Sequence, residues 1–352
     1  MLTGKENNMK LRPLFITSGI LIVLGAACAI AGAGMNGGTI KNIEQETFED
    51  KSRAFENCRE ITISDFDTDV EIITTNGEMR VDYTESEKSR YEISETDGRV
   101  GIKKKADLRL FDFSVVTDKR KLILYVPEGF DGVLDVSTSN SRLSAEGISA
   151  GETKLDNSNG SMTLTGCSLG DFDVSLSNGR CDVISCGGSG AVIWNSNGDI
   201  VIEELTASGK LTVDSSNGTI KLDGITAKEL RAEMSNGQIT AGTISVLGKA
   251  ELENSNGRIT IGSITAEELE AENSNGGIKL DYADCLRIKL GTSNADVTGT
   301  LAGTIASYSV RSEATNGKSS LPDEMKGGDR TLEVEVSNGN IALDFDGSDF
   351  CF

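Results

Sequence analysis

Apolar residues along most of the chain alternate with polar ones in short runs that meet at a Ser-Asn-Gly corner. With each repeat asparagine set at position zero, apolar residues recur six and four residues before it and three and five residues after it. Around Asn217, these positions hold Leu211, Val213, Ile220 and Leu222. A spacing of two is the periodicity of a β-strand with one buried face. Each unit therefore predicts a strand, a corner, a second strand and a second corner.

The corner recurs at intervals of 19 to 22 residues along the chain. The repeat asparagines are Asn140, Asn159, Asn178, Asn197, Asn217, Asn236, Asn256, Asn275, Asn294, Asn316 and Asn338. Serine precedes each one except at Thr315, and glycine follows each one except at Ser141 and Ala295. A period near 20 is the signature of a solenoid whose units stack on one another. The sequence therefore predicts an all-β, β-helix-like solenoid of about eleven Ser-Asn-Gly repeats over residues 134–345.

The apolar residues before each corner stand an even number of residues from the asparagine. Because alternate residues of a strand face the same side, we expect the asparagine to point into the coil with them. There, its side-chain amide would hydrogen-bond the amides of the rungs above and below, or the backbone of the corner. An unpaired buried amide costs about 1–3 kcal/mol, which favours a complete ladder over isolated asparagines. The alternative is a ligand-binding stripe, which is less favoured because the same residue recurs whatever surrounds it.

Residues 14–34 are uncharged and long enough to span a bilayer as a transmembrane helix. Basic residues precede this segment, so the positive-inside rule places residues 1–13 in the cytoplasm and the rest of the chain outside. A secretory signal cleaved among the small residues at 29–33 is one alternative, and a lipoprotein attached through Cys28 is another. All three interpretations export the solenoid.

The other segments lack the repeat. Residues 35–60 are polar and predict a linker, and residues 346–352 form a short tail. Residues 61–133 alternate like strands but have no fixed period. Because the terminal units of a solenoid must cover its open core, we expect this irregular region to be a cap.

The composition of the chain limits the ligands and reactions that it can support. The formal net charge is −21, and the acidic residues are spread along the rungs, so no basic stripe is offered to nucleic acid. The chain contains no histidine, which excludes histidine-dependent triads and zinc sites. Stacked carboxylates such as Glu233, Glu253 and Glu272 offer only weak cation binding. The sequence therefore predicts no cofactor, no metal site and no enzyme.

Two further features are candidate sites. Cys167 and Cys186 each stand eight residues after a repeat asparagine, so we expect them to stack inside adjacent rungs. A rung spacing of about 4.8 Å permits a disulfide, but parallel side-chain directions favour two buried thiols. Trp194, the only tryptophan, stands three residues before Asn197 and should face outward as a surface contact or a sugar platform.

The stretch Leu-Ile-Leu-Tyr-Val-Pro-Glu-Gly at residues 122–129 leads into the Ser-Asn-Gly repeats. In this combination the chain resembles the DUF4097 family of β-strand-repeat proteins from bacterial envelopes, over about residues 60–345. The resemblance implies a β-solenoid in a family labelled as adhesins because of its shape, and it supplies no catalytic residues.

Together with the N-terminal segment, this resemblance leads us to expect a single-pass protein of the bacterial cell membrane with an extracellular solenoid. Its expected role is non-catalytic binding or scaffolding, with an envelope protein or polysaccharide as the partner. The alternatives are an accessory protein of cell-envelope stress sensing and, less favoured, a polysaccharide-acting enzyme.

Overall fold

The computed structural model describes residues 47–106 and 121–347. All of these except Thr47 belong to one compact unit. The predicted transmembrane segment at residues 14–34 and the tail at residues 1–13 lie outside the described residues. Among the residues that are described, no helix is long and apolar enough to cross a membrane.

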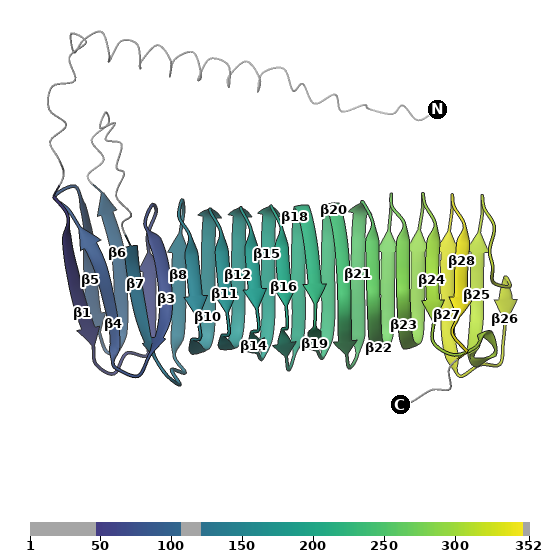
Figure 1. Cartoon of the computed structure of the whole chain (residues 1–352), viewed down its shortest axis with the longest axis horizontal. Helices are drawn as coiled ribbons and strands as arrows, with labels where there is room; N and C mark the ends of the chain where they lie inside the picture. The colour runs from purple at the N-terminus through teal and green to yellow at the C-terminus, as the bar shows by residue number, and fades with distance from the viewer. Residues whose placement is uncertain (1–46, 107–120, 348–352) are drawn as a thin grey trace, which may run out of the picture. The chain divides into compact units, whose positions relative to one another are not determined.

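This unit is an all-β solenoid of about eleven turns, which confirms the fold predicted from the repeat. Its 28 strands pair into one continuous sheet, and most neighbouring strands run in parallel. Figure 1 shows the strands of successive coils side by side, from β1 and β5 at one end to β25 and β26 at the other. Within the described ranges, the one helical element is the 3-10 helix η1 (Ile305–Ser307).

Each coil has three faces, and strands pair along each face from one coil to the next. The first face holds, in spatial order, β5 (Ser89–Thr96), β6 (Arg99–Ala106), β2 (Glu60–Ser64), β8 (Val133–Thr138), β10 (Ser149–Asn159), β12 (Ser168–Asn178), β15 (Gly190–Asn197), β18 (Lys210–Asp223), β20 (Glu229–Val246), β21 (Lys249–Asn256), β22 (Ile259–Asn273), β23 (Ile278–Thr292), β27 (Arg330–Val336), β25 (Tyr308–Ala314) and β26 (Glu324–Met325).

The second face continues around the Ser-Asn-Gly corner. It holds β1 (Glu49–Phe55), β4 (Met79–Glu85), β7 (Lys121–Pro127), β3 (Asp69–Thr75), β9 (Leu143–Glu146), β11 (Met162–Thr165), β13 (Cys181–Ile184), β16 (Ile200–Glu203), parts of the long strands β18, β20, β22 and β23, β24 (Val297–Leu301) and β28 (Ile341–Phe345). The short third face includes β14 (Gly187–Gly188), β17 (Thr206–Ala207) and β19 (Ile225–Ala227).

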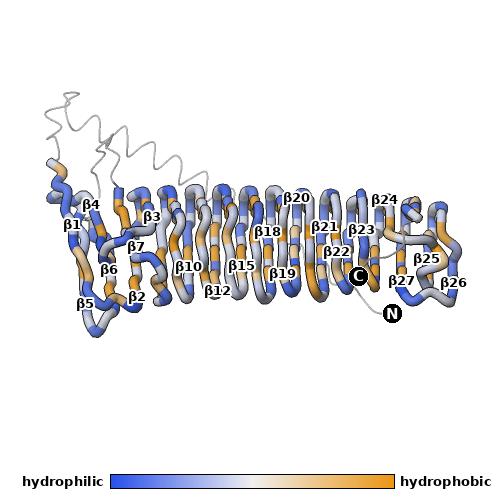
Figure 2. The backbone as a smooth tube through the Cα atoms, turned by 60° about the horizontal axis from the view of Figure 1, so that its bottom comes forward, coloured by the Kyte–Doolittle hydropathy of each residue, from blue (hydrophilic) through white to orange (hydrophobic). Residues whose placement is uncertain are grey.

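The core is a stack of aliphatic side chains from all three faces. Leu211, Val213, Ile220 and Leu222, which the pattern placed inside, are fully buried. Figure 2 shows apolar and polar residues alternating along the strands of successive coils. Because equivalent positions pair in register, each coil places its apolar residues directly beside those of the next coil.

The Ser-Asn-Gly corners stack closely enough to require glycine. Gly198 and Gly237 have φ angles of +136° and +145°, a backbone region that disfavours side chains. In addition, a Cβ at Gly237 would lie 1.8 Å from the carbonyl oxygen of Gly218 in the preceding coil. Both the conformation and the packing therefore select glycine at this position.

At the C-terminal end, the last two repeats stack in reverse order. Strand β27 lies between β23 and β25. The last repeat, which contains β27, therefore stacks directly on the coil of β23, and the repeat before it, which contains β25, lies at the outer end. The chain between β25 and β27 then crosses the open end, where Ser319 pairs with Ile341 and Leu321 is buried. This crossing covers the last rung of the core.

At the N-terminal end, antiparallel pairs replace the parallel stacking. Strand β5 pairs with β6, and β1 pairs with β4. Strand β1 lies within residues 35–60, which corrects the expectation of a linker for that part of the segment. All but the last residue of β1 is exposed and most are polar or charged, as is typical of a protected sheet edge.

A buried ionic cluster holds the loop between β2 and β3 in this N-terminal part. Lys104 is almost fully buried, and its Nζ contacts Asp67 and Thr68 and lies 3.7 Å from Asp65 Oδ1. Asp65 Oδ1 accepts the backbone N–H groups of residues 66–68, and Asp65 Oδ2 accepts the Tyr91 hydroxyl at 2.5 Å. The cluster therefore fixes the loop against β5 and β6.

Candidate binding face

A row of carboxylates runs along the outside of the first face, which we call the acidic row. Strand pairing places its members side by side or across one rung: Asp214, Glu233, Glu253, Glu272 and Glu335. Gly291 lies in the row between the last two carboxylates and has no side chain to fill the space.

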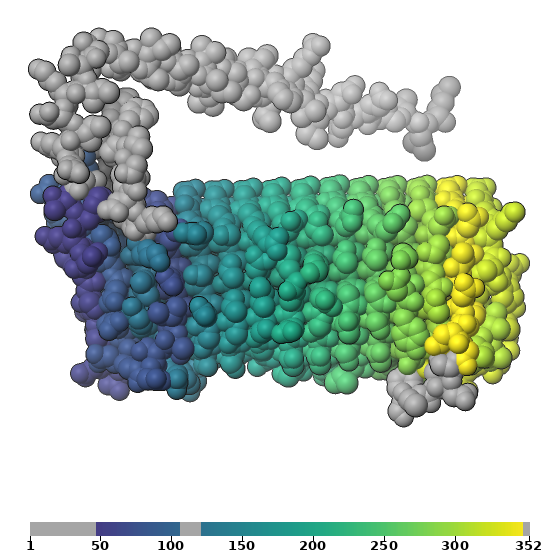
Figure 3. Space-filling model, viewed as in Figure 1, coloured from purple at the N-terminus to yellow at the C-terminus, as the bar shows by residue number. Residues whose placement is uncertain are grey.

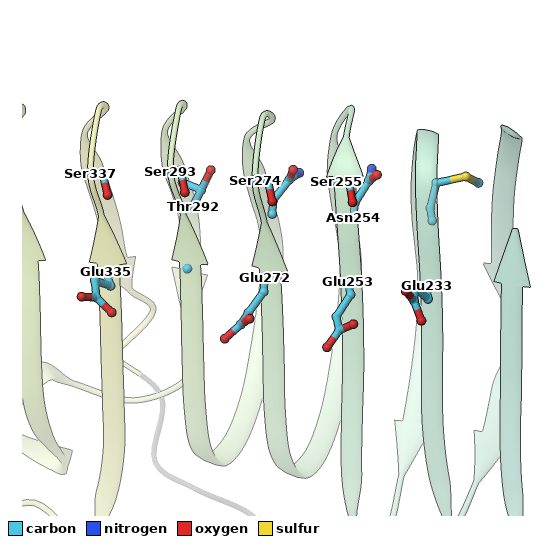
Figure 4. A pocket seen from close by; sticks show the side chains of 13 residues that line it. Glu233, Glu253, Asn254, Ser255, Glu272, Ser274, Thr292, Ser293, Glu335 and Ser337 are labelled. Atoms are coloured by element: carbon cyan, nitrogen blue, oxygen red, sulfur yellow. The ribbon is translucent and has the colours of Figure 1, made fainter. Parts of the chain in front are cut away.

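The gap at Gly291 belongs to a shallow groove along the rod with a volume of about 390 Å³. The carboxylates form one wall of the groove, and a second file of polar side chains forms the other. This second file includes Ser255, Ser274, Ser293 and Ser337, each directly before a repeat asparagine. Figure 4 shows Glu233, Glu253 and Glu272 in successive strands and Glu335 beyond the strand of Ser293, with the serines above them near the corners.

Cations on the same face neutralise part of the acidic row. Arg231 donates to Glu233 and Glu251 at 2.8 Å each and lies 3.4 Å from Glu253. Hydrogen bonds from Lys249 and Lys289 lower the pKa of Glu270 to about 2. In contrast, burial raises the pKa of Glu253 above its usual value. Lys289 also donates to Glu272 at 2.6 Å. Within the acidic row, Asp214 and Glu335 are therefore the two carboxylates that no ion pair engages in the described structure.

The network around Glu270 makes a testable contribution to stability. At pH 7, Glu270→Gln should lower the free energy of unfolding by about 1 kcal/mol, because Lys249 and Lys289 lose a shared acceptor. The folded-state pKa of about 2 lies below the ordinary value of 4.5, so this stabilisation is present above pH 4.5 and lost as the pH falls toward 2. Urea unfolding across this pH range measures it. Glu335→Gln is the control, and equal effects of both substitutions would contradict the prediction.

Trp194 stands in line with the acidic row, one coil before Asp214. Its side chain is 39% exposed, and Val192 on the same strand is 44% exposed. These are the two large apolar residues that β15 presents outward, and Ser175 and Asp214 flank the indole on the neighbouring strands. The outward orientation is the one that the spacing from Asn197 predicted.

Asp214 is unusual within this face. Its Oδ1 atom is buried and has no hydrogen-bond partner in the described structure. Burial, followed by the nearby charge of Glu233, raises its pKa above the ordinary value. An oxygen that is shielded from water and has no donor is unfavourable for the ionised carboxylate, which is the cause of the raised pKa. No ion pair in the described structure offsets this cost.

The repeat asparagines lie at the exposed corner, so the expectation that they point into the coil is wrong. Counted from the repeat asparagine, inward residues stand at even offsets before the corner (six and four residues earlier) and at odd offsets after it (three and five residues later). The asparagine therefore lies where the alternation is interrupted. The amides still bond from coil to coil: Asn178 Nδ2 donates to Asn159 Oδ1 at 2.9 Å, and Asn197 Nδ2 donates to Asn178 Oδ1 at 3.1 Å. The same bond joins the remaining repeat asparagines.

A second, buried set of asparagines lies two residues before the repeat asparagine. Asn254 Nδ2 donates to the carbonyl oxygen of Gly237 at 2.9 Å, and Asn254 Oδ1 accepts the N–H of Asn256 at 3.1 Å. Asn157, Asn195 and Asn273 occupy equivalent positions. These interior amides bind corner backbone, which gives both sets of asparagines a place in holding the corners together.

Cys167 and Cys186 are brought together but are free thiols in this structure. Both are buried and lie on adjacent rungs, where Gly187 N–H donates to the carbonyl oxygen of Cys167 at 2.9 Å. Cys186 Sγ donates to the carbonyl oxygen of Ile184 at 3.3 Å, and Cys167 Sγ lies 3.5 Å from that of Thr165. The neighbouring Cys186 thiol and burial raise the pKa of Cys167. Cys285, which pairs in register with Ala266, is also fully buried. In the described part of the chain, no three carboxylate or thiol groups are placed to hold a metal ion.

The fold and this face define a parallel β-solenoid with a regular, charged outer surface. A family model described as "Toastrack DUF4097" matches residues 58–213 and 192–344. The chain therefore belongs to the DUF4097 family, as its resemblance implied. No curated protein matches the chain.

Several solved structures are similar to the chain. A "putative cell adhesion protein" from Clostridium sporogenes is 11% identical, with a TM-score of 0.21, over 85% of this chain and 100% of that one. A "putative adhesin" from Parabacteroides distasonis is 12% identical, with a TM-score of 0.33, over 85% and 97% of the two chains. Another from Bacteroides fragilis is 10% identical, with a TM-score of 0.25, over 84% and 97%.

Proposed function

We propose that this chain is a membrane-anchored protein of the bacterial cell surface that binds an envelope component through its first face, without catalysis. The observation that carries the proposal is the position of Trp194, an exposed aromatic residue in line with a row of carboxylates on a continuous parallel sheet. Buried aliphatic residues and corner amides hold the coils together, whereas this row faces outward, where a partner can reach it. Figure 3 shows the coils packed into one continuous body, which suits a rigid display surface.

The absence of histidine supports a non-catalytic role, since it removes the commonest general base. The acidic row also lacks the arrangement that sugar-cleaving enzymes use. Those enzymes place one carboxylic acid and one carboxylate on opposite sides of a bound sugar, whereas here the carboxylates follow one another along one line. A binding surface therefore accounts for the row better than an active site does.

The test is retention of the full-length protein, in non-ionic detergent, on an immobilised envelope fraction from the producing cell. Trp194→Ala should reduce the bound fraction about ten-fold, because exposed tryptophans are frequent anchors of binding interfaces. Leu247→Ala is the matched control, since Leu247 is 81% exposed at a different corner of the coil.

Equal retention of both variants and the unsubstituted protein would contradict a role for the first face. Retention on host matrix alone would instead favour adhesion to a host. Accessibility of a C-terminal epitope to antibody on intact cells tests the proposed export, and labelling only after lysis would contradict it.

A further inference from the structure

We infer that the Trp194 end of the acidic row is a docking site for a basic, arginine-containing segment of a partner protein. The inference rests on the proposed function and names the chemistry of the partner. It starts from two neighbouring groups on the first face, the exposed indole of Trp194 and the unpartnered carboxylate oxygen of Asp214.

The two groups stand on adjacent strands and point outward from the same face, about 4.8 Å apart along the rod. An indole face attracts a cation within about 6 Å of its centre, most strongly among the aromatic side chains. Only Oδ1 of the Asp214 carboxylate is buried, and no ion pair holds the group in the described structure, so a cation beside the indole would supply its missing charge partner. A single cationic group can therefore satisfy both residues at once.

The chemistry of the pair favours guanidinium over a simple amine. A guanidinium is planar, stacks on aromatic rings and presents a fork of donors that matches a carboxylate. Lysine and amino sugars carry a compact, strongly hydrated ammonium, which makes a point contact and stacks less well.

The partner segment should extend along the acidic row. Arg231, whose charge acts on Asp214, is engaged by Glu233, Glu251 and Glu253, and no ion pair joins it to Asp214. Beyond it, Glu272 pairs with Lys289, whereas Glu335, past the gap at Gly291, has no ion pair in the described structure. Carboxylates outnumber cations along the row, so further basic residues of the partner would meet net negative charge, whereas an acidic segment would be repelled.

Trp194 is the only tryptophan of the chain, so its fluorescence reports directly on this site. The full-length protein in non-ionic detergent is titrated with a tryptophan-free oligo-arginine peptide, and an oligo-glutamate peptide serves as the negative probe. We expect a saturable fluorescence change with oligo-arginine only. Binding should weaken as ionic strength rises from about 0.1 M to 1 M, because the screening length falls from about 10 Å to 3 Å.

Titration calorimetry of substituted proteins then measures how much each residue contributes to the affinity for oligo-arginine. Asp214→Asn and Trp194→Ala should each weaken oligo-arginine binding about five-fold or more, which corresponds to losing one cation–π or charge-assisted contact. Asp344→Asn, which removes the same charge from the outside of the second face on β28, should change affinity by less than about two-fold.

Equal affinity of Asp214→Asn and Asp344→Asn, or no saturation, would overturn the inference. Tighter binding of a glucosamine oligosaccharide than of oligo-arginine would also overturn it, in favour of a polysaccharide. Retention on the envelope fraction that depends on Trp194 but not on Asp214 would reject this partner chemistry and leave the proposed function standing. Retention on the envelope fraction that is unchanged by Trp194→Ala would reject the proposed function itself.

Discussion

Replacing Gly237 with alanine should lower the free energy of unfolding by about 3 kcal/mol or more, among the largest effects expected of one methyl group. The new Cβ would lie 1.8 Å from the carbonyl oxygen of Gly218, which belongs to the backbone of the preceding corner and cannot rotate away. The φ angle of +145° adds strain for any residue with a side chain. Denaturant unfolding monitored by circular dichroism measures the loss.

Gly166→Ala separates the two causes of this effect. Gly166 also has a positive φ angle, +64°, but a Cβ there would meet no atom within 4 Å. Its substitution should therefore cost about 1–2 kcal/mol, the price of the left-handed conformation alone. A Gly237→Ala variant no less stable than Gly166→Ala would show that the corners do not stack as closely as described.

Lys104→Met should destabilise the N-terminal end by about 3 kcal/mol, since removing one partner of a buried ion pair leaves an uncompensated charge. The Asp65 side chain is fully buried, and Lys104 is the cation nearest to it among the described residues. The remaining partners of Asp65 are three backbone N–H groups and the Tyr91 hydroxyl, which do not neutralise its carboxylate. Hydrogen exchange of the loop between β2 and β3 localises the effect, and denaturant unfolding gives its size.

Lys105→Met is the matched control because Lys105 is the next residue on β6 and faces the other way. Its side chain is 60% exposed and pairs with Glu92 at 2.5 Å, so its removal should cost at most about 1 kcal/mol. If the two methionine variants unfold at the same denaturant concentration, the buried cluster does not hold this end of the solenoid.

The candidate binding face was only partly predictable. The spacing between Trp194 and Asn197 was enough to place the indole outside, because alternation along a strand is strict. The carboxylates Glu233, Glu253 and Glu272 could be stacked from the period alone. The missing donor at Asp214, however, depends on which neighbouring cations engage other carboxylates, and the sequence does not determine those pairings.

The repeat period also located two of the cysteines. Their equal distance from a repeat asparagine placed Cys167 and Cys186 on adjacent rungs, and the structure has them there as buried thiols. Cys285, by contrast, has no cysteine on a neighbouring rung. It is fully buried because it pairs in register with Ala266 at an inward position of the third face, as Ala227 and Val246 do in earlier coils.

Local alternation and a fixed period are enough to predict the all-β solenoid, its repeat length and the inward aliphatic positions. The order of the last two rungs, in which Asn338 bonds to Asn294 and Asn316 bonds to Asn338, became visible only in the folded chain. The repeat constrains which residues can stack but not which coil stacks on which, and at the open end the chain must also cover the core. The exposed position of the corner asparagines was likewise decided by the turn, where the strand alternation stops.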